Sequence, residues 1–457
     1  MLSEGRQGAP GRSRTAGGPR PDRRAEAAAP AGLPARQAAF GAVAEVLRSG
    51  VALDDALART RTVSDDPLVR AIAVATFRHL GSLGRVLQTR LSRGLSEDER
   101  AFALLATGAA QILHLQVADH AAVSLTVEIA RRDPTLGHLA GLANAVLRRV
   151  VREREAILAE AVPALVEAPV WLAERWVAHY GADRAEAIAL AHRDGAPVDV
   201  TVRDDPEGWA ERLGGAVLPT GSVRLASRTA VPDLPGFEDG AWWVQDAAAA
   251  LPARLLDVRP GERVLDMCAA PGGKTAQLAA AGGRVTALDR SGPRLQRLAD
   301  NMARLRLEVE AIRADALAFR AEAFDAVLLD APCTATGTLR RHPDVAWTKQ
   351  RTDLASLADL QRRLLDKAAA LTRPGGRLVY CVCSLEPEEG GEQVAAFLAR
   401  QPDFERVAVD PAALGLRPDA SSPAGDLRTL PDGLAAHPGV RGGLDGFFAA
   451  HLSRKQP

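Results

Sequence analysis

The sequence predicts a multidomain protein in which an all-α helical bundle precedes a Rossmann-like α/β domain with a mostly parallel sheet. The chain has 457 residues, and a domain holds roughly 100–200, so more than one domain is expected. Apolar residues recur at helical spacing from Leu33 to about Arg154, whereas strand-like and helix-like segments alternate after residue 246. Hydrophobic residues make up 47% of the chain, which is enough for both parts to have cores.

Charge and cysteine content exclude several classes of protein. Lys+Arg and Asp+Glu both number 57, so nothing indicates capture of a nucleic acid by net charge, although a local basic groove needs none. The cysteines have no CxxC spacing, so we expect neither a disulfide framework nor a bound metal. The N-terminus has no apolar segment of the secretory type, and the uncharged run 101–118 has the apolar spacing of a buried helix. We therefore expect a cytoplasmic protein without membrane attachment.

The N-terminal part divides into three segments. Residues 1–32 are rich in Arg, Gly, Ala and Pro, which predicts a disordered tail. Residues 33–154 predict the helical bundle, and 155–195 predict linker helices. On these linker helices, Trp171 and Trp176 are better explained by interdomain packing than by stacking against bases.

A small α/β module leads into the core, with strands at 198–202 and 216–218 and a helix at 206–213. Predicted strands and helices then alternate along the core. Its strands are predicted at 263–267, 284–289, 309–314, 325–330 and 377–383. Its helices are predicted at 274–281, 291–306, 354–371 and 388–399. Such alternation gives a parallel sheet, and ligands of these sheets bind outside the carboxyl ends of the strands.

A glycine-rich turn joins the first core strand to its helix. It reads Cys268-Ala269-Ala270-Pro271-Gly272-Gly273-Lys274-Thr275. Such a turn brings backbone N–H groups and the positive end of a helix against a ligand. The next strand ends at Asp289, whose carboxylate is well placed to accept hydrogen bonds from ribose hydroxyls. Together the turn and the acid indicate a nucleotide-like cofactor.

Two further core strands end in a thiol. Cys333 follows the strand at 325–330, and Cys383 ends the strand at 377–383. If these strands are neighbours in a parallel sheet, both thiols lie at its carboxyl edge, facing the glycine-rich turn. Taken alone, any one of these cysteines is better explained as a small buried hydrophobe. Cys381 falls on the same face of its strand as Cys383, and we interpret it as core packing.

These segments resemble the RNA cytosine-C5 methyltransferases of the Nol1/Nop2/Sun (Fmu) family. The glycine-rich turn resembles the family's cofactor loop, and two stretches resemble its fourth and sixth motifs. They are Asp330-Ala331-Pro332-Cys333-Thr334-Ala335-Thr336-Gly337, with Arg340-Arg341-His342-Pro343-Asp344 after it, and Cys383-Ser384-Leu385-Glu386-Pro387-Glu388-Glu389. Bundle segments 121–123 and 141–149 resemble the NusB-type RNA-binding domain of the bacterial small-subunit rRNA members. The sequence departs from the family at Val382, where threonine is usual.

The resemblance implies a class I methyltransferase fold with a seven-stranded sheet, which uses S-adenosylmethionine and no metal. The residues that it assigns to the cofactor are Cys268, Ala269, Ala270, Pro271, Gly272, Gly273, Lys274, Asp289, Asp315 and Asp330. Asp289 would contact the ribose and Asp315 the adenine; either could otherwise be a helix cap. Cys383 is implied as the nucleophile and Cys333 as the thiol that assists product release. Asp330 would also hold the N3 edge of the target cytosine.

The same resemblance implies contacts to RNA. Arg340, Arg341 and His342 are expected on a loop at the mouth of the site, where arginines clamp phosphates; a salt-bridged loop is the alternative. Arg148 and Arg149 lie at a predicted helix end and either contact phosphate or form a solvated helix face.

The implied chemistry explains why thiols are needed. Cytosine C5 is too weak a nucleophile to take a methyl group unaided. Addition of a cysteine thiolate at C6 makes C5 enamine-like, and the nucleophile must therefore be deprotonated. The base must also leave its stack to enter such a pocket.

Four segments result from these arguments. They are a tail (1–32), a NusB-like RNA-binding domain (33–154), a linker with a small RNA-facing module (155–245) and a methyltransferase domain (246–457). The NusB-like domain indicates small-subunit rRNA as the substrate, and we expect a monomer. Two alternatives remain open: a tRNA cytosine-C5 methyltransferase, and a non-catalytic RNA-binding assembly or antitermination factor.

Overall fold

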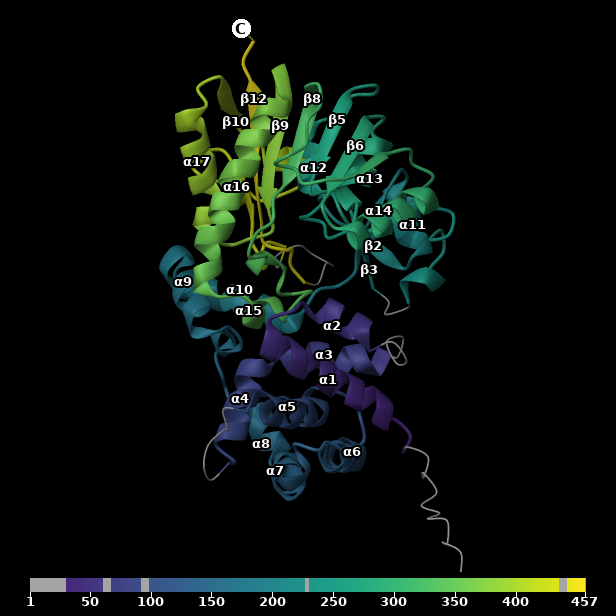
Figure 1. The fold of residues 1–457 in the computed structure, drawn as a ribbon, viewed down its shortest axis with the longest axis vertical. Coiled ribbons are helices and arrows are strands. Elements are labelled where there is room, and N and C mark those ends of the chain that lie inside the picture. The colour runs from purple at the N-terminus through teal and green to yellow at the C-terminus, as the bar shows by residue number, and fades with distance from the viewer. Residues whose placement is uncertain (1–29, 61–66, 92–97, 227–229, 435–441, 457) are drawn as a thin grey trace, which may run out of the picture.

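The computed structural model describes residues 30–60, 67–91, 98–226, 230–434 and 442–456. Figure 1 shows a helical bundle at one end, connecting helices and a small sheet in the middle, and a large sheet with its helices at the other end. The predicted tail lies outside the described residues up to position 29.

The bundle is built around one buried helix. Its helices are α1 (Leu33–Ser49), α2 (Leu53–Arg59), α3 (Pro67–Arg78), α4 (Leu80–Gln88), α5 (Glu99–His114), α6 (Asp119–Arg132) and α7 (Ala140–Arg152). Helix α5 packs against α1, α3, α4, α6 and α7, so the uncharged run is a bundle helix as predicted. Gly108 allows α7 to approach it, because a Cβ there would lie 2.7 Å from Leu147 Cδ1. None of the described helices is long and apolar enough to cross a bilayer.

Connecting helices fasten the bundle to the sheet domain. They are α8 (Arg154–Ala159), α9 (Val170–Tyr180) and α10 (Ala182–Asp194). Trp176 of α9 is 1% exposed and packs in one cluster with Leu339, Ala346 and Leu385 of the α/β core. The prediction that this tryptophan serves interdomain packing is therefore confirmed.

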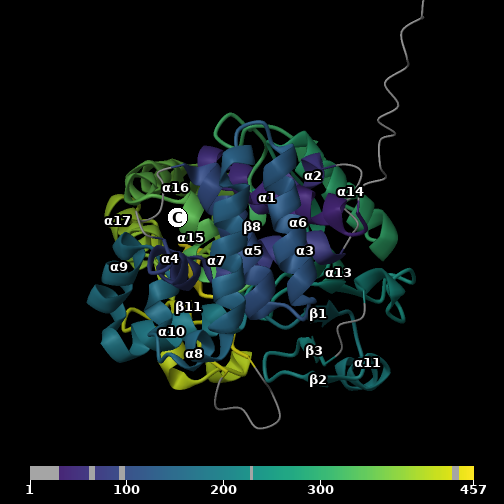
Figure 2. The ribbon, with the colours of Figure 1, turned by 90° about the horizontal axis from the view of Figure 1, so that it is seen from below.

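The small module is a four-stranded antiparallel sheet of order β2-β3-β1-β4. Its elements are β1 (Asp199–Val202), α11 (Pro206–Arg212), β2 (Gly215–Val217), β3 (Val223–Leu225) and β4 (Trp242–Val244). Figure 2, viewed from the bundle end, shows this module and α14 to one side of the bundle, with α9, α10 and α17 on the opposite side.

The large sheet has the order β10-β12-β9-β8-β5-β6-β7, and a short strand, β11, pairs with β12. Strands β9, β8, β5, β6 and β7 are parallel, whereas β12 runs antiparallel between β9 and β10. The strands are β5 (Arg263–Met267), β6 (Arg284–Asp289), β7 (Glu310–Arg313), β8 (Phe324–Asp330), β9 (Thr372–Val382), β10 (Phe404–Val407), β11 (Leu427–Thr429) and β12 (Phe447–Arg454). The seven-stranded, mostly parallel sheet of the prediction is confirmed.

Helices cover both faces of this sheet (Figure 1). The helices are α12 (Leu251–Leu256), α13 (Gly273–Ala280), α14 (Gly292–Leu305), α16 (Arg351–Leu371) and α17 (Gly391–Arg400). The short helix α15 (Val345–Thr348) instead lies at the junction, where it contacts α1 of the bundle. Helices α16 and α17 share a core with Leu329 and Val382, whereas α12 and α13 share the opposite core with Leu328 and Cys381. Successive residues of β8 and β9 thus face opposite sides, as strand geometry requires.

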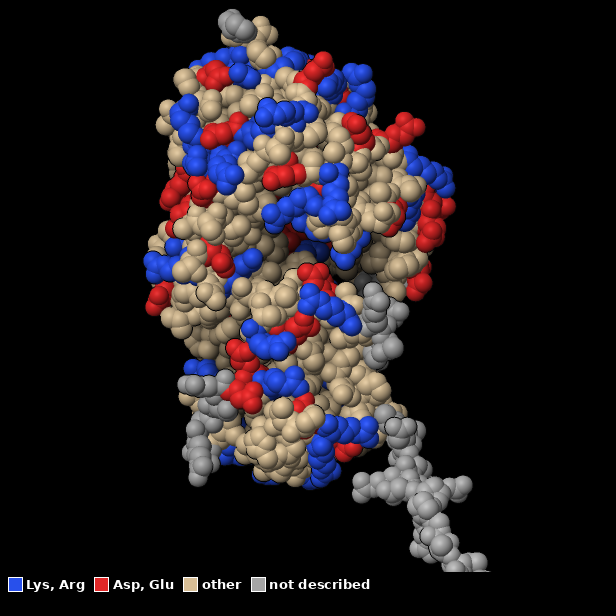
Figure 3. All heavy atoms as spheres, in the orientation of Figure 1, with Lys and Arg blue, Asp and Glu red and all other residues tan. Residues whose placement is uncertain are grey.

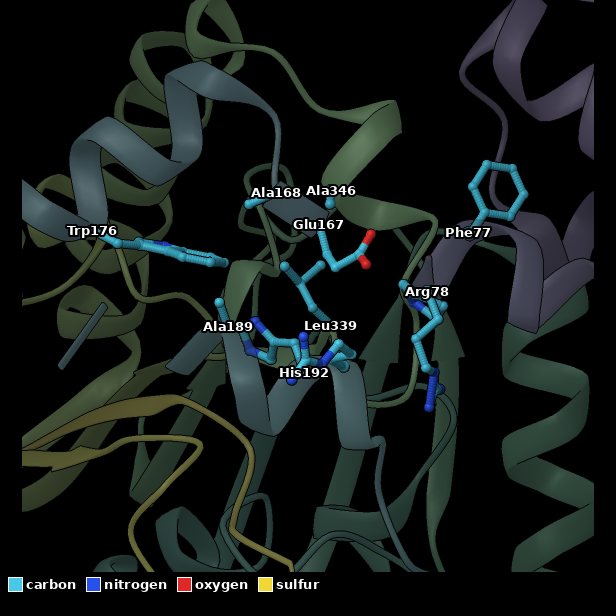
Figure 4. A pocket seen from close by; sticks show the side chains of 11 residues that line it. Phe77, Arg78, Glu167, Ala168, Trp176, Ala189, His192, Leu339 and Ala346 are labelled. Carbon is cyan, nitrogen blue, oxygen red and sulfur yellow. The ribbon is translucent and has the colours of Figure 1, made fainter. Parts of the chain in front are cut away.

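A small cavity lies where the bundle, the connecting helices and the core meet (Figure 4). It measures about 20 Å³, roughly what a single water molecule requires. His192, Trp176 and Arg78 line it, and burial lowers the pKa of His192 to about 3, with Arg340 and Arg78 adding to the effect. We interpret the cavity as packing at a domain junction, because it is too small for a substrate.

Candidate active site

The turn between β5 and α13 is the loop that the sequence identified, and its shape depends on two residues with positive φ. Cys268 has φ 62° and Gly272 has φ 102°; at Gly272 a Cβ would lie 2.8 Å from Leu298 Cγ. Asp289 fastens the loop, since its carboxylate accepts hydrogen bonds from Ala270 N (3.2 Å) and Ser291 N (2.8 Å). Glycine is therefore required at position 272 both by conformation and by space.

A cavity of about 440 Å³ opens beside this loop, at the carboxyl ends of β5 and β8. Its lining combines the loop with side chains from the small module, from α14 and from β12. Its lining includes Gln245, Asp246, Asp266, Ala269, Ala270, Pro271, Gly272, Gly273, Lys274, Asp330, Arg341, His342, Cys383, Asp445 and Phe447. In Figure 3 the molecule is hollowed where the bundle meets the α/β domain, with charges of both signs around the hollow.

Lys274 and Asp330 form an ion pair in the wall of this cavity. Lys274 Nζ lies 2.7 Å from Asp330 Oδ2 and 4.8 Å from the centre of the Phe447 ring. Burial acts to lower the pKa of Lys274, but the Asp330 charge outweighs it and the net pKa is raised. The side chain therefore stays cationic although it is only 10% exposed.

Asp266 is a site residue that the sequence argument missed. Its carboxylate lines the cavity; Oδ2 accepts a hydrogen bond from Thr275 Oγ1 at 2.6 Å, and Oδ1 has no partner among the described residues. Burial raises its pKa to about 7, against the opposing effect of the Thr275 hydrogen bond. The sequence does show an acid one position before the end of β5, but a single acid within an apolar strand does not by itself indicate a site.

The two predicted thiols converge. Cys333 Sγ and Cys383 Sγ lie 3.5 Å apart, because β8 and β9 are neighbours in the parallel sheet. Of the four cysteines, only Cys383 lines the cavity. The hydrogen bond to Cys383 and burial raise the pKa of Cys333 well above its usual value, and the charges of Cys383 and Glu389 add to this.

The remaining thiols are set apart from this pair. Cys381 is fully buried in the core that includes α12, and its Sγ lies 3.6 Å from Asp330 Oδ1. Burial, followed by the charge of Asp330, raises the pKa of Cys381. Burial likewise raises the pKa of Cys268 to about 12. Interpreting Cys381 as core packing agrees with its position.

The structure corrects the prediction for Arg340. Its side chain is fully buried, with Nη1 3.4 Å from Asp445 Oδ1 and 3.7 Å from Asp246 Oδ2. Arg341 donates hydrogen bonds to the same two carboxylates but remains 20% exposed and lines the cavity. Arg340 thus follows the salt-bridged alternative, because two acids from distant parts of the chain meet it, whereas Arg341 still reaches the cavity. His342 lines the cavity and is 45% exposed.

Other predicted residues lie outside this cavity. Asp315 is exposed and accepts a hydrogen bond from Leu317 N at 2.9 Å, as a local turn cap does. Arg148 and Arg149 are exposed on α7, at the far end of the molecule from α13 (Figure 1), and Arg149 pairs with Glu153 at 2.7 Å. Across the described ranges, no group of three or more His, Cys, Asp or Glu could hold a metal ion.

Helix α9 reaches the loop that follows Cys383. Arg175 forms ion pairs with the buried Glu386 and with Glu388, the latter at 2.6 Å. Tyr180 Oη donates a hydrogen bond to the backbone oxygen of Leu385. A connecting helix therefore supports the segment that carries one of the two thiols.

Comparisons with known proteins agree with this arrangement. Residues 253–453 match the family model for the 16S rRNA methyltransferase RsmB/F, and residues 33–152 match the NusB family. The ribosomal RNA small subunit methyltransferase B of Vibrio cholerae is 36% identical over 92% of this chain and 97% of its own length. The protein of that description from Xylella fastidiosa strain 9a5c is 41% identical over 88% and 94%.

Solved structures share the fold. The crystal structure of PH0851 matches 92% of this chain and 99% of its own, with a TM-score of 0.73 and 24% identity. A methyltransferase homolog protein from Pyrococcus horikoshii matches 62% of this chain and 94% of its own, with a TM-score of 0.52 and 29% identity. In this chain the NusB-family domain precedes the methyltransferase domain. Because the two relatives above match this chain over almost their whole length, the chain belongs to the RsmB/F family of 16S rRNA methyltransferases.

Proposed function

We propose that this protein transfers a methyl group from S-adenosylmethionine to C5 of a cytosine in small-subunit rRNA, through a covalent bond between Cys383 and C6. The observation that carries the proposal is the convergence of two thiols, 3.5 Å apart, at a cavity walled by the glycine-rich loop. A binding protein without methyl-transfer chemistry has no need of paired thiols beside such a loop.

The residues of the cavity fit S-adenosylmethionine. The free Oδ1 of Asp266 offers an acceptor to the ammonium group of its methionine portion, and the backbone N–H groups of Gly273 and Lys274 lie at the start of α13. Lys274 and Asp330 would lie near the same end of the molecule. Asp289 and Asp315 remain our candidates for the ribose and the adenine. When bound, the cofactor supplies an electrophilic methyl group to C5.

The chain's own residues would perform the remaining chemistry. The Cys383 thiolate adds to C6, which moves electron density onto C5. Asp330 would hold the N3 edge of the flipped base. In the release step a base takes the C5 proton, the C–H electron pair re-forms the C5–C6 double bond, and Cys383 leaves as the thiolate. Cys333 is placed to assist that step.

We assign four segments on this basis. They are a tail (1–32), an RNA-binding NusB-like domain (33–154), a linker with an RNA-facing module (155–245) and the methyltransferase domain (246–457). Arg341 and His342 would contact RNA at the cavity, and Arg148 and Arg149 on the bundle. The protein would act as a monomer in the cytoplasm.

The test is methyl transfer from labelled S-adenosylmethionine to unmodified small-subunit rRNA and, in parallel, to tRNA. We expect wild type and Cys381→Ala to label the rRNA, Cys383→Ala to be inactive, and Cys333→Ala to accumulate a covalent protein–RNA adduct seen as a gel shift. Labelling of tRNA alone would support a tRNA enzyme instead. Activity in Cys383→Ala would overturn the assignment of the nucleophile, and a wild type that binds RNA but no methyl donor would support a non-catalytic factor.

A further inference from the structure

A buried acid lies next to the two converging thiols. Glu389 is the last residue of the 3₁₀ turn η5 (Pro387–Glu389), and its side chain is fully buried. Neither the cofactor nor the cytosine in the proposed reaction would touch it, because it does not line the cavity. Burying a carboxylate without hydrogen-bonding partners is costly, so the partners of Glu389 indicate what it does.

The partners of Glu389 come from both thiol-bearing loops. Oε1 accepts hydrogen bonds from Thr334 N and from Gln361 Nε2 of α16, both at 2.9 Å. Oε2 accepts from Thr334 Oγ1 and from Ser384 Oγ, the latter at 2.5 Å. Thr334 directly follows Cys333, and Ser384 directly follows Cys383. One carboxylate therefore joins the residues next to each thiol and attaches both to α16.

Further bonds keep the Glu389 backbone and the two loops from moving independently. Tyr380 Oη donates to the backbone oxygen of Glu389 at 2.6 Å. Gly337 N donates to the Cys383 oxygen, and Leu385 N donates to Thr336 Oγ1, each at 3.0 Å. Four hydrogen bonds converge on the two oxygens of the Glu389 side chain, so this side chain is the centre of the network.

We propose that Glu389 is a positioning residue for the methyl-transfer reaction, which holds the Cys333 and Cys383 loops together so that both thiols address one cytosine. This inference rests on the proposed function of the two cysteines. Reactions that need two groups on one substrate lose about 100-fold in rate when a group is misplaced by about 1 Å. An acid that fixes both loops protects the 3.5 Å separation of the sulfurs.

The charge of Glu389 also affects the pKa of Cys333. The pKa of Cys333 is raised first by its hydrogen bond to Cys383 and by burial, and then by the charges of Cys383 and Glu389. A raised pKa keeps Cys333 in its neutral form. Replacing Glu389 by an uncharged residue lowers the pKa of Cys333, whereas removing one hydroxyl from the network alters geometry but keeps the charge.

The experiment compares Glu389→Gln with the exposed neighbour Glu392→Gln in the full-length protein. In Glu389→Gln we expect kcat for RNA methylation to fall about 10- to 100-fold, with the KM for S-adenosylmethionine within about twofold of wild type. The alkylation of Cys333, measured by mass spectrometry across pH, should be faster than in wild type below the midpoint of the titration, because removing the Glu389 charge lowers the pKa of Cys333. Glu392→Gln should match wild type in both measurements.

A second pair of variants separates geometry from charge and remains informative if Glu389→Gln does not fold. Thr334→Val should lower kcat about tenfold without moving the alkylation midpoint of Cys333, and Thr334→Ser should restore the rate. Alkylation needs neither RNA nor methyl donor, so it tests Glu389 even if wild type methylates no RNA. Wild-type kcat and an unmoved Cys333 midpoint in Glu389→Gln would overturn the proposal.

Discussion

The raised pKa of Asp266 predicts that the affinity for the cofactor depends on pH. This pKa is raised to about 7, chiefly by burial; the residue lines the cavity, and its Oδ1 has no partner among the described residues. The charged groups that face it are Asp330, Asp289 and Lys274. If the ammonium group of the ligand pairs with this carboxylate, binding requires the ionised form. Below the pKa, binding must first release a proton, so affinity falls as pH falls.

The size of the effect follows from the fraction ionised. With a pKa of about 7, roughly 9% of Asp266 is ionised at pH 6 and roughly 91% at pH 8. The dissociation constant for S-adenosylhomocysteine should therefore be about tenfold higher at pH 6 than at pH 8. This difference corresponds to about 1.4 kcal/mol of binding free energy. In the unliganded protein the same raised pKa stabilises the fold at low pH. That contribution is complete below the unfolded value of 3.8 and is lost as pH rises through about 7.

Titration calorimetry with S-adenosylhomocysteine at pH 6, 7 and 8 measures this directly. Two buffers with different ionisation enthalpies should show about one proton released per ligand bound near pH 6. Asp266→Asn keeps the acceptor for the Thr275 hydroxyl but cannot ionise, so its affinity should be lower and independent of pH in this range. Equal affinities of wild type at pH 6 and 8, or the same pH dependence in Asp266→Asn, would refute the reasoning.

Two further predictions concern packing. Trp176→Ala removes a buried indole from the junction and should lower the free energy of unfolding, measured in urea, by about 3–5 kcal/mol. Val170 lies on the same helix and is 73% exposed, so Val170→Ala should change this free energy by less than about 0.5 kcal/mol. Gly337→Ala places a Cβ 1.8 Å from the Gly446 oxygen, so it should lower the free energy of unfolding by about 1–3 kcal/mol and slow methyl transfer. Gly391→Ala is the control, because no atom lies within 4 Å of the Cβ that it adds. Equal behaviour of the two variants would contradict the predicted clash.

Local sequence predicted the strands well because each core strand is an apolar run closed by a turn signal. The run before the glycine-rich loop was placed at 263–267, as β5 is. Strand β9 begins at Thr372 rather than 377, since it pairs with β8 on both sides of an irregularity between Phe324 and Ala326. Nothing within one strand reports such pairing with its neighbour.

The site was predictable where a motif is continuous and not where it is assembled from distant segments. The loop and Cys383 were found because their neighbours in sequence are also their neighbours in space. Arg340 was placed wrongly because Asp246 and Asp445, which neutralise it, lie about a hundred positions away on either side. Their approach depends on β12 returning beside β9, which is a property of the whole fold.

The contacts of α9 bear on how such proteins can be inherited. Arg175 and Tyr180 belong to neither family match, 33–152 or 253–453, yet they support the segment after Cys383. A recombination event that joined the catalytic half to a new N-terminal half anywhere after α9 would discard them and expose the apolar surface around Leu385. The unit that recombination can transplant intact therefore begins before residue 170, and α9 stays with the methyltransferase domain rather than with the NusB-family domain.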